Sequence, residues 1–164
     1  MIKKHVKKYI ICEKNTKIYN FIILYMINWD QVDNKVKVFS YEGRKCEGKV
    51  VRVYDGDTVH IVFPLTDKEP ERLYKWNCRL INIDTPELRT KNLKEKEFGK
   101  QVRDFLKERI LNKVVTVECL DFDKYGRLLV EIFIGDESIN NWLIEMGYAK
   151  KYDGGTKHKW FVEE

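Results

Sequence analysis

The sequence predicts a mainly β fold with added helices (α+β), in which the helices pack on one small antiparallel barrel. Five runs rich in β-branched and aromatic residues alternate in places and are separated by Gly, Asp and Pro, which is typical of short strands. Two other segments repeat apolar residues at helical spacing. The resulting order of three strands, a helix, two strands and a helix favours a barrel with helices packed on it.

The expected elements all follow residue 45. The strands are expected at 48–54, 57–63, 73–83, 114–119 and 127–134. The first helix is expected at 95–111, with an apolar face of Phe98, Val102, Phe105, Leu106 and Ile110. The second is expected within 137–148, with an apolar face of Ile139, Trp142, Leu143 and Met146. Gly147 is suited to ending this helix.

Composition indicates a folded domain and excludes a disordered chain. The 164 residues suffice for one ordinary domain with its own core, and 43% of them are hydrophobic while 35% are charged. The net charge of +5 arises from many charges of both signs, so it is only a mild bias toward polyanions. Cys12, Cys46, Cys78 and Cys119 form no CxxC pair, which disfavours a zinc site and a disulfide framework.

Residues 1–44 lack a clear period, and we expect them to form a divergent N-terminal extension to a domain at 45–164. Their most apolar segment, 21–27, is much shorter than the roughly 20 residues of a membrane helix. It also lacks a small-residue cleavage site, although a membrane-associated or cleaved segment stays an alternative. We therefore expect a soluble monomer without stable membrane insertion, intracellular rather than secreted.

Three short motifs carry acids or arginines at strand ends. They are YDGDTV (54–59), IDTPE (83–87) and DKYGR (123–127). Each alone has a simple structural explanation, because Asp, Gly and Pro are common turn residues. DKYGR, for example, fits a tight hairpin with Asp123 and Gly126 in the turn.

Taken together, the motifs offer the groups that phosphodiester cleavage requires. The carboxylates of Asp57 and Asp84 are hard oxygen ligands that suit Ca²⁺. Arg79 and Arg127 each offer a planar fork that can hold the charge building on a phosphoryl group. Glu87 could orient or deprotonate the attacking water. A purely structural calcium-binding domain would leave the arginine pair unexplained.

The stretches VRVYDGDTVHI, CRLINIDTPE and DKYGRLLVEIF, in this order, resemble the thermonuclease family of staphylococcal nuclease-like enzymes. The resemblance runs from about Gly48 to Tyr152. It implies an OB-fold five-stranded barrel with two or three packed helices. It further implies Ca²⁺-dependent hydrolysis of DNA and RNA, with little sequence specificity, that leaves 3′-phosphate and 5′-hydroxyl ends.

The resemblance also implies roles for single residues. Asp57 and Asp84 fall on the calcium carboxylates and Thr85 on a residue that lends a backbone carbonyl, while Asp55 lies just outside this shell. The catalytic positions correspond to Arg79, Glu87 and Arg127. Lys124 and Tyr125 match positions beside the bound nucleotide. Tyr152 is a further aromatic neighbour of the base, or else a packing tyrosine.

Two function classes stay open from the sequence. One is the calcium-dependent nuclease, and the other is a noncatalytic module that binds nucleic acid or protein on the same barrel. Because a noncatalytic copy would be expected to lose some of the acids or arginines, the complete set favours the enzyme. The charge run RTKNLKEKE after Glu87 is either a solvated loop or, with Arg89 and its lysines, part of the nucleic-acid path.

Overall fold

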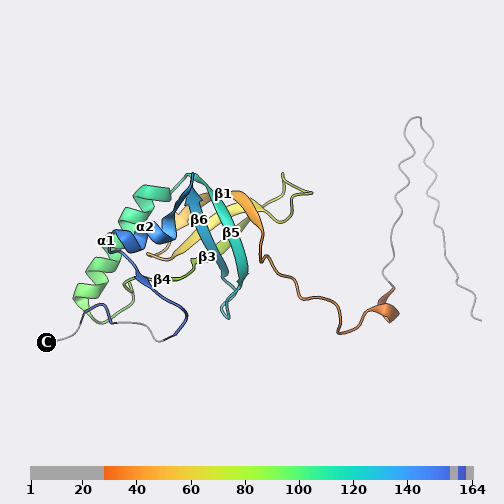
Figure 1. Cartoon of the computed structure of the whole chain (residues 1–164), viewed down its shortest axis with the longest axis horizontal. Coiled ribbons are helices and arrows are strands. Elements are labelled where there is room, and N and C mark those ends of the chain that lie inside the picture. Colours follow the sequence, from red (N-terminus) through yellow and green to blue (C-terminus); the bar gives the residue numbers. More distant parts are fainter. Residues whose placement is uncertain (1–27, 156–158, 162–164) are drawn as a thin grey trace, which may run out of the picture. The chain divides into compact units, whose positions relative to one another are not determined.

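The computed structural model describes residues 28–155 and 159–161 (Figure 1). The chain divides into two compact units, Met1–Lys37 and Val38–Glu164. In the first unit, the described part contains one short 3-10 helix, η1 (Trp29–Gln31), which Asn28 caps by accepting a hydrogen bond from the Asp30 amide. The expected apolar segment 21–27 lies outside the described residues.

The second unit is built on a sheet in the order β3-β2-β1-β5-β6-β7. Its strands are β1 (Lys45–Val53), β2 (Thr58–Pro64), β3 (Leu73–Leu80), β5 (Val114–Phe122), β6 (Leu128–Ile134) and β7 (Glu137–Ser138). A parallel pairing of β3 with β6, from Cys78–Leu128 to Leu80–Val130, closes the sheet. The five long strands thus form the closed barrel that the sequence predicts, because closure leaves neither β3 nor β6 as an open edge.

Alternating residues of β2 and β5 point into the barrel. On β2, Val59, Ile61 and Phe63 are fully or almost fully buried, and Val115, Val117 and Cys119 are their counterparts on β5. Gly48 on β1 lies at a tight point of this core, because a Cβ there would be 2.6 Å from a methyl group of Ile61. The period-two pattern read from the sequence is therefore the inward face of the barrel.

The third strand is shorter than the sequence predicts. It ends at Leu80, because Asn82 adopts a left-handed conformation (φ 60°) that Asn tolerates better than most residues. After this turn, β4 (Ile83–Asp84) pairs with β8 (Lys150–Lys151) in a separate two-stranded sheet. Asp84 therefore lies on β4, opposite Lys150, and not on the barrel strand.

Two helices, α1 (Leu93–Ile110) and α2 (Ile139–Glu145), pack against the barrel (Figure 1). They are neighbours, because the Arg109 guanidinium of α1 lies 5.5 Å from the centre of the Trp142 ring of α2. Val102, Leu106 and Ile110 of α1 are fully buried, as are Ile139 and Leu143 of α2. Gly147 follows α2 with a positive φ of 72°, as expected for the end of this helix.

Two residues of the expected apolar faces are exposed instead. Phe105 is 45% exposed and stacks on Tyr148 at the edge of the helix pair, and Met146 is 52% exposed. Met146 is the C-cap of α2, so it lies beyond the helical face that packs on the barrel. The helical spacing of apolar residues therefore predicted one residue too many for the buried face of each helix.

A buried amide joins α2 to the barrel. The Asn140 side chain donates hydrogen bonds to the carbonyls of Ile81 (3.0 Å) and Val130 (3.3 Å) and accepts one from the Ile132 amide (3.4 Å). Because Ile81 leads into β4, Asn140 fixes the start of the segment that carries Asp84 and Thr85.

Part of the expected extension 1–44 contacts the barrel. Tyr41 is 4% exposed, packs edge-on against Trp76, and donates a hydrogen bond from its hydroxyl to the Leu65 carbonyl. The Arg44 guanidinium donates to the carbonyls of Pro64 and Leu65 and pairs with Asp67. These contacts lie within the unit that begins at Val38.

Cys46, Cys78 and Cys119 are free thiols, whereas Cys12 lies outside the described residues. Within the described part of the chain, no helix is both long and apolar enough to cross a membrane.

Candidate active site

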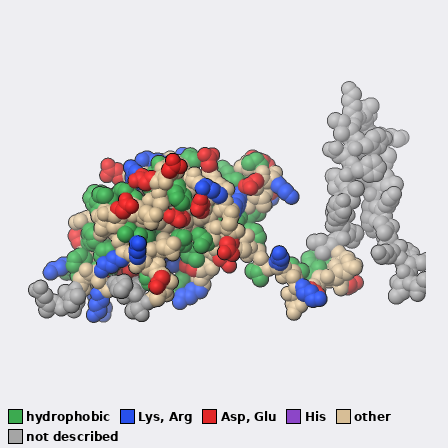
Figure 2. All heavy atoms as spheres, viewed as in Figure 1, with side chains coloured by type: hydrophobic (Ala, Val, Ile, Leu, Met, Phe, Trp, Pro, Cys, Tyr) green, Lys and Arg blue, Asp and Glu red, His purple; other side chains and the backbone are tan. Residues whose placement is uncertain are grey.

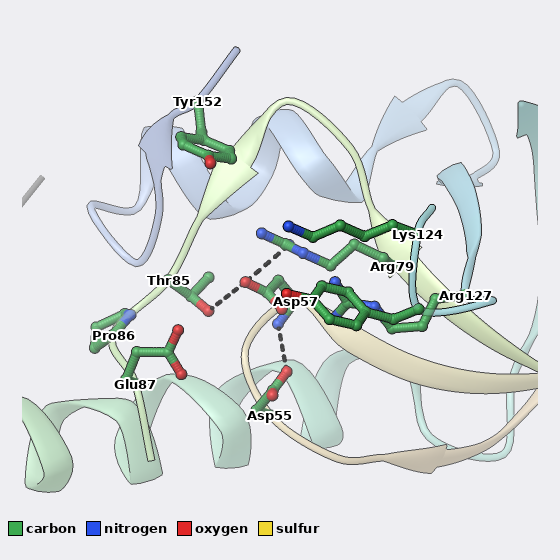
Figure 3. A pocket seen from close by; sticks show the side chains of 10 residues that line it. Asp55, Asp57, Arg79, Thr85, Pro86, Glu87, Lys124, Arg127 and Tyr152 are labelled. Carbon is green, nitrogen blue, oxygen red and sulfur yellow. Dashed lines mark hydrogen bonds and ion pairs between the residues drawn. The ribbon is translucent and has the colours of Figure 1, made fainter. Parts of the chain in front are cut away.

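One polar cavity of about 390 Å³ opens at the end of the barrel (Figure 3). Three separate segments supply its walls: the β1–β2 turn, the segment after β4, and the β5–β6 hairpin. Arg79 and Tyr152 complete the lining. The lining residues are Asp55, Asp57, Arg79, Thr85, Pro86, Glu87, Lys124, Tyr125, Arg127 and Tyr152.

The β1–β2 turn is organised by Asp55, whose carboxylate accepts hydrogen bonds from the amides of Asp57 (3.1 Å) and Thr58 (2.7 Å). This bonding turns the Asp57 side chain toward the cavity (Figure 3). Gly56 between them is in close contact with Thr85, because a Cβ at this position would lie 2.7 Å from the Thr85 hydroxyl oxygen. In the sequence DGD, Asp55 therefore stabilises the turn by hydrogen bonds, and Gly56 allows the turn to approach Thr85 closely.

Asp57 is 7% exposed and has partners on several sides. It forms an ion pair with Arg79 at 2.8 Å, and the hydroxyls of Thr58 and Thr85 each donate to it at 3.1 Å. Such charge-assisted hydrogen bonds compensate a carboxylate for the loss of water. Asp57 is therefore an ion-paired and hydrogen-bonded carboxylate in the lining of the cavity.

Arg79 enters from the end of β3 and is also buried, with 8% exposure. Besides pairing with Asp57, its guanidinium donates to the carbonyls of Leu80 (3.0 Å) and Ile83 (2.9 Å). These two carbonyls flank the turn at Asn82. Arg79 thus has a structural task, since it ties the end of β3 to the start of β4.

Asp84 and Thr85 are each 3% exposed, and they follow one another at the end of β4. The backbone after them is held by α1, in which Gly99 lets the helix approach the Pro86 carbonyl. A Cβ at Gly99 would lie 2.8 Å from that oxygen. The β4–β8 pairing and the helix together set the position of both residues.

Glu87 is exposed at the rim, and Figure 3 shows its carboxylate turned toward the cavity. Its backbone amide donates to the Glu95 carboxylate (3.2 Å), which also accepts from the Thr90 hydroxyl (3.0 Å). Glu95 is in the first turn of α1, whose N-cap is Asn92. The loop carrying Glu87 is therefore anchored to a helix start, while the side chain can reach solvent and ligand.

Arg127 is held by the acid of its own hairpin. The Asp123 carboxylate accepts from the Arg127 Nε (2.7 Å) and from the amides of Arg127 (2.9 Å) and Tyr125 (2.8 Å). Desolvation by burial raises the pKa of Asp123, but the bonds from Arg127 and Tyr125 outweigh it, so its pKa lies below the ordinary value. Gly126, with a φ of 74°, completes the turn.

Cationic and aromatic side chains form the outer wall. Tyr125 is 73% exposed, with Lys124 Nζ 5.1 Å and the Arg127 guanidinium 5.6 Å from its ring centre. Tyr152 is held at the rim because its amide donates to the Asn82 carbonyl (3.0 Å) and its hydroxyl to the Gly155 carbonyl (2.9 Å). An exposed ring beside cations is suited to a stacked base and its phosphate.

Comparison with known proteins identifies the family. The profile described as Staphylococcal nuclease homologue matches residues 77–161, about half of the chain. The chain belongs to the staphylococcal nuclease family. A thermonuclease of Staphylococcus hyicus is 36% identical over 120 residues, which are 71% of this chain and 66% of that protein.

Two further relatives align with different shares of this chain. A thermonuclease of Staphylococcus intermedius is 33% identical over 147 residues, or 87% of this chain and 83% of that protein. An uncharacterized endonuclease of Escherichia coli is 33% identical over 107 residues, or 65% of this chain and 61% of that protein. Family membership confirms the resemblance read from the three motifs.

In this family member, eight of the nine site residues expected from the sequence line the same cavity. The ninth, Asp84, is buried next to Thr85. Sequence reasoning missed the anchoring role of Asp123, which it placed only in the hairpin turn. An acid four residues before Arg127 was the available signal, but turn chemistry explained it equally well.

Proposed function

We propose that the chain is a calcium-dependent nuclease, which as a monomer hydrolyses phosphodiester bonds of DNA and RNA with little sequence specificity. It leaves 3′-phosphate and 5′-hydroxyl ends. The observation that carries the proposal is the convergence of Arg79, Arg127 and Glu87 with Asp57 around one cavity, from elements far apart in the chain. Membership in the staphylococcal nuclease family supports it.

The buried oxygen donors fit a Ca²⁺ ion. We assign the ion to the carboxylates of Asp57 and Asp84 and to Thr85, all at most 7% exposed. In the described part of the chain, no three His, Cys, Asp or Glu side chains are grouped so that they could hold a metal ion, so carbonyls and water would complete the shell. Ca²⁺ accepts such mixed oxygen shells of about 6 to 8 ligands. When bound, the ion would polarise the phosphate.

The chain's own residues would then act on the phosphate and the water. Glu87 orients the attacking water or takes its proton as the new P–O bond forms and the bond to the 5′-oxygen breaks. The 5′-oxygen takes a proton from solvent water and leaves as a hydroxyl. Arg127 and Arg79 donate hydrogen bonds to the phosphoryl oxygens, whose charge grows during attack. Lys124, Tyr125 and Tyr152 hold the adjoining nucleotide.

A cleavage assay with metal exchange tests this function. Purified protein should cut single-stranded DNA and RNA in Ca²⁺, should lose activity with a chelator and should regain it when Ca²⁺ is restored. Mg²⁺ should support little cleavage, because it demands a tighter octahedral shell than two carboxylates and a threonine supply. End labelling of the products should reveal 3′-phosphates.

Two outcomes would contradict the proposal. Robust cleavage in Mg²⁺ with calcium removed would show that the metal assignment is wrong. Binding of DNA or RNA without cleavage in Ca²⁺ would instead support the alternative, a noncatalytic binding module on this barrel.

A further inference from the structure

A second group of cations and an aromatic ring lies beside the cavity, built from Arg52, Tyr54 and Arg89. The Arg52 and Arg89 guanidinium carbons are 5.6 and 5.9 Å from the centre of the Tyr54 ring. Arg52 and Arg89 are exposed and Tyr54 is 36% exposed, so all three can be reached by a ligand. We call this group the Tyr54 rim.

The backbone fixes the Tyr54 rim to the cavity. The pairing of β1 with β2 is irregular between Val50 and Arg52, which places Val51 and Arg52 both outside the barrel and returns Val53 to the core. The Tyr54 amide donates to the Thr58 carbonyl (2.9 Å), at the base of the turn that carries Asp57. Arg89 follows Glu87 by two residues.

Two acids, Asp55 and Glu87, lie close to the Tyr54 rim along the chain. Among residues 28–155 and 159–161, neither Arg52 nor Arg89 forms an ion pair with a carboxylate. Desolvation lowers the pKa of His60, and the nearby charges of Arg52 and Lys75 lower it further. Arg52, His60 and Lys75 therefore lie near one another on the outer face of β1–β3.

The visible face of the molecule carries charges of both signs (Figure 2). Figure 2 shows Lys and Arg side chains interspersed with Asp and Glu over the visible surface of the barrel. A localised pair of guanidiniums beside a catalytic cavity is better suited to single phosphates than to general attraction of a polyanion.

Asp55 and Glu87 lie on the side of the cavity away from Lys124 (Figure 3). Tyr54 directly precedes Asp55 in the sequence, and Arg89 follows Glu87 by two residues. We propose that Arg52 and Arg89, braced by the Tyr54 ring, bind phosphates of the nucleic-acid strand where it leaves the cavity opposite Lys124 and Tyr125. This inference rests on the proposed function and adds a strand-binding site outside the catalytic residues.

The chemistry of the three side chains fits this task. A guanidinium can hold two phosphate oxygens at once, and its attraction to the face of the Tyr54 ring limits the orientations that it samples. Ordering the two long side chains in advance reduces the entropy lost when a strand binds. The rim has no acceptor aimed at a base edge, so it should serve any sequence.

Binding at varied salt tests the inference without cleavage. A fluorescent single-stranded oligothymidylate is titrated with protein in a chelator, for wild type and for the double variant Arg52→Ala/Arg89→Ala. Two exposed charge contacts correspond to roughly a tenfold increase in Kd. Loss of two phosphate contacts should also reduce the slope of log K against log salt by about 1.4, given about 0.7 per contact on single strands.

The matched control is Lys68→Ala/Arg72→Ala, which removes the same charge from the β2–β3 loop. Arg72 lies over the Tyr74 ring at 5.8 Å, a contact of the same kind away from the cavity. The control should keep the wild-type slope. If both double variants lose the same slope, the effect is one of net charge and the site does not exist.

Cleavage of short and long substrates separates this inference from the proposed function. In Ca²⁺, the double variant Arg52→Ala/Arg89→Ala should cut a dinucleotide as fast as wild type but should show a higher KM for the long strand. An equal loss on both substrates would overturn the inference, because the arginines would then act in the cavity. If wild type cuts neither substrate, the proposed function fails, whereas the salt slopes still decide whether the rim binds phosphate.

Substitution of Tyr54 tests whether its ring orients Arg52 and Arg89. Tyr54→Phe should retain the wild-type salt slope, since it keeps the aromatic face, and Tyr54→Ala should raise the Kd for the long strand. Equal affinities of the Phe and Ala variants would contradict a role for the ring. Thermal melts of all variants show whether the fold is intact.

Discussion

Arg79 and Arg127 differ in how much structure depends on them. Arg79 is buried with Asp57 and bonds to two backbone carbonyls, so its removal would leave a buried charge and unpaired carbonyls. The Arg127 side chain is 26% exposed and bonds mainly to Asp123 within its own hairpin. Arg127 is therefore the better residue for separating catalysis from stability.

Arg127→Ala should leave the fold intact with at most a modest drop in melting temperature, because Asp123 keeps its backbone hydrogen bond from Tyr125. It should lower kcat by about 10²- to 10³-fold, the typical cost of one lost donor to a developing charge. Arg127→Lys should restore little, because an ammonium cannot reproduce the planar fork. Arg103→Ala, on the surface of α1, is the control for loss of charge. Normal turnover of Arg127→Ala would show that Arg127 has only a structural role in the hairpin.

Asp123 predicts a pH dependence of stability. Its pKa in the folded protein lies below the ordinary 3.8, so its contribution to folding is present above pH 3.8 and is lost as the pH falls through the folded value. Asp123→Asn keeps the shape of the side chain without the charge. Thermal melts should show wild type melting higher than Asp123→Asn above pH 4, with the difference shrinking below it. A constant difference across this range would contradict the assigned role.

The turns and helices around the cavity are coupled through two close approaches, at Gly56 and at Gly99. Gly56 faces Thr85 on one side and Val102 of α1 on the other, with Cβ contacts of 2.7 to 2.9 Å. A change in the β1–β2 turn is therefore transmitted directly to the β4 segment and to α1. These contacts explain how residues of different elements keep one geometry.

Gly56→Ala should destabilise the protein by about 1–3 kcal/mol, the usual cost of overpacking a tight site. It should also reduce cleavage, because the new methyl group pushes against Thr85. Gly155→Ala is the control, since among the described residues its Cβ would meet only the flexible Asp153 carboxylate, at 3.2 Å. Urea unfolding and cleavage rates measure both effects. A Gly56→Ala protein as stable and active as Gly155→Ala would show that the turn moves freely.

The chain as a whole raises the question of where its folded domain begins. The sequence predicts that residues 1–44 are an extension. In the structure, however, the Tyr41 hydroxyl and the Arg44 guanidinium both donate hydrogen bonds to the Leu65 carbonyl, in the loop after β2. The Tyr41 ring lies between Phe39, Phe63 and Trp76. Residues up to Lys37 belong to the other compact unit. The independence of the extension stays a prediction.

Two truncated chains test it. A protein that begins at Val38 should melt cooperatively near the full-length temperature and keep calcium-dependent cleavage. One that begins at Lys45 should melt clearly lower, because loss of a buried aromatic ring typically costs about 3–5 kcal/mol. If the Val38 protein aggregates or melts much lower, residues 1–37 supply packing to the core and are not an appendage.

Much of the fold could be predicted because its signals are local. The inward residues of β2 alternate along a short run, and the buried residues of α1 recur at helical spacing, so a window of the sequence contains each pattern. The break at Asn82 was missed because the apolar run continues to Ile83. The small β4–β8 sheet joins residues more than sixty positions apart, and no pattern within a short window of the sequence predicts such a pairing.

The sequence by itself determined the strand and helix pattern, the family and the set of acids and arginines, because these depend on residue type and spacing. Only the tertiary structure decided that Asp57 bonds to Thr85 across the cavity, that Asp123 holds Arg127, and that Tyr41 belongs to the core. It also brought Arg52 and Arg89 to the same ring. Such contacts depend on barrel closure and helix packing, which place residues distant in the chain within hydrogen-bonding range.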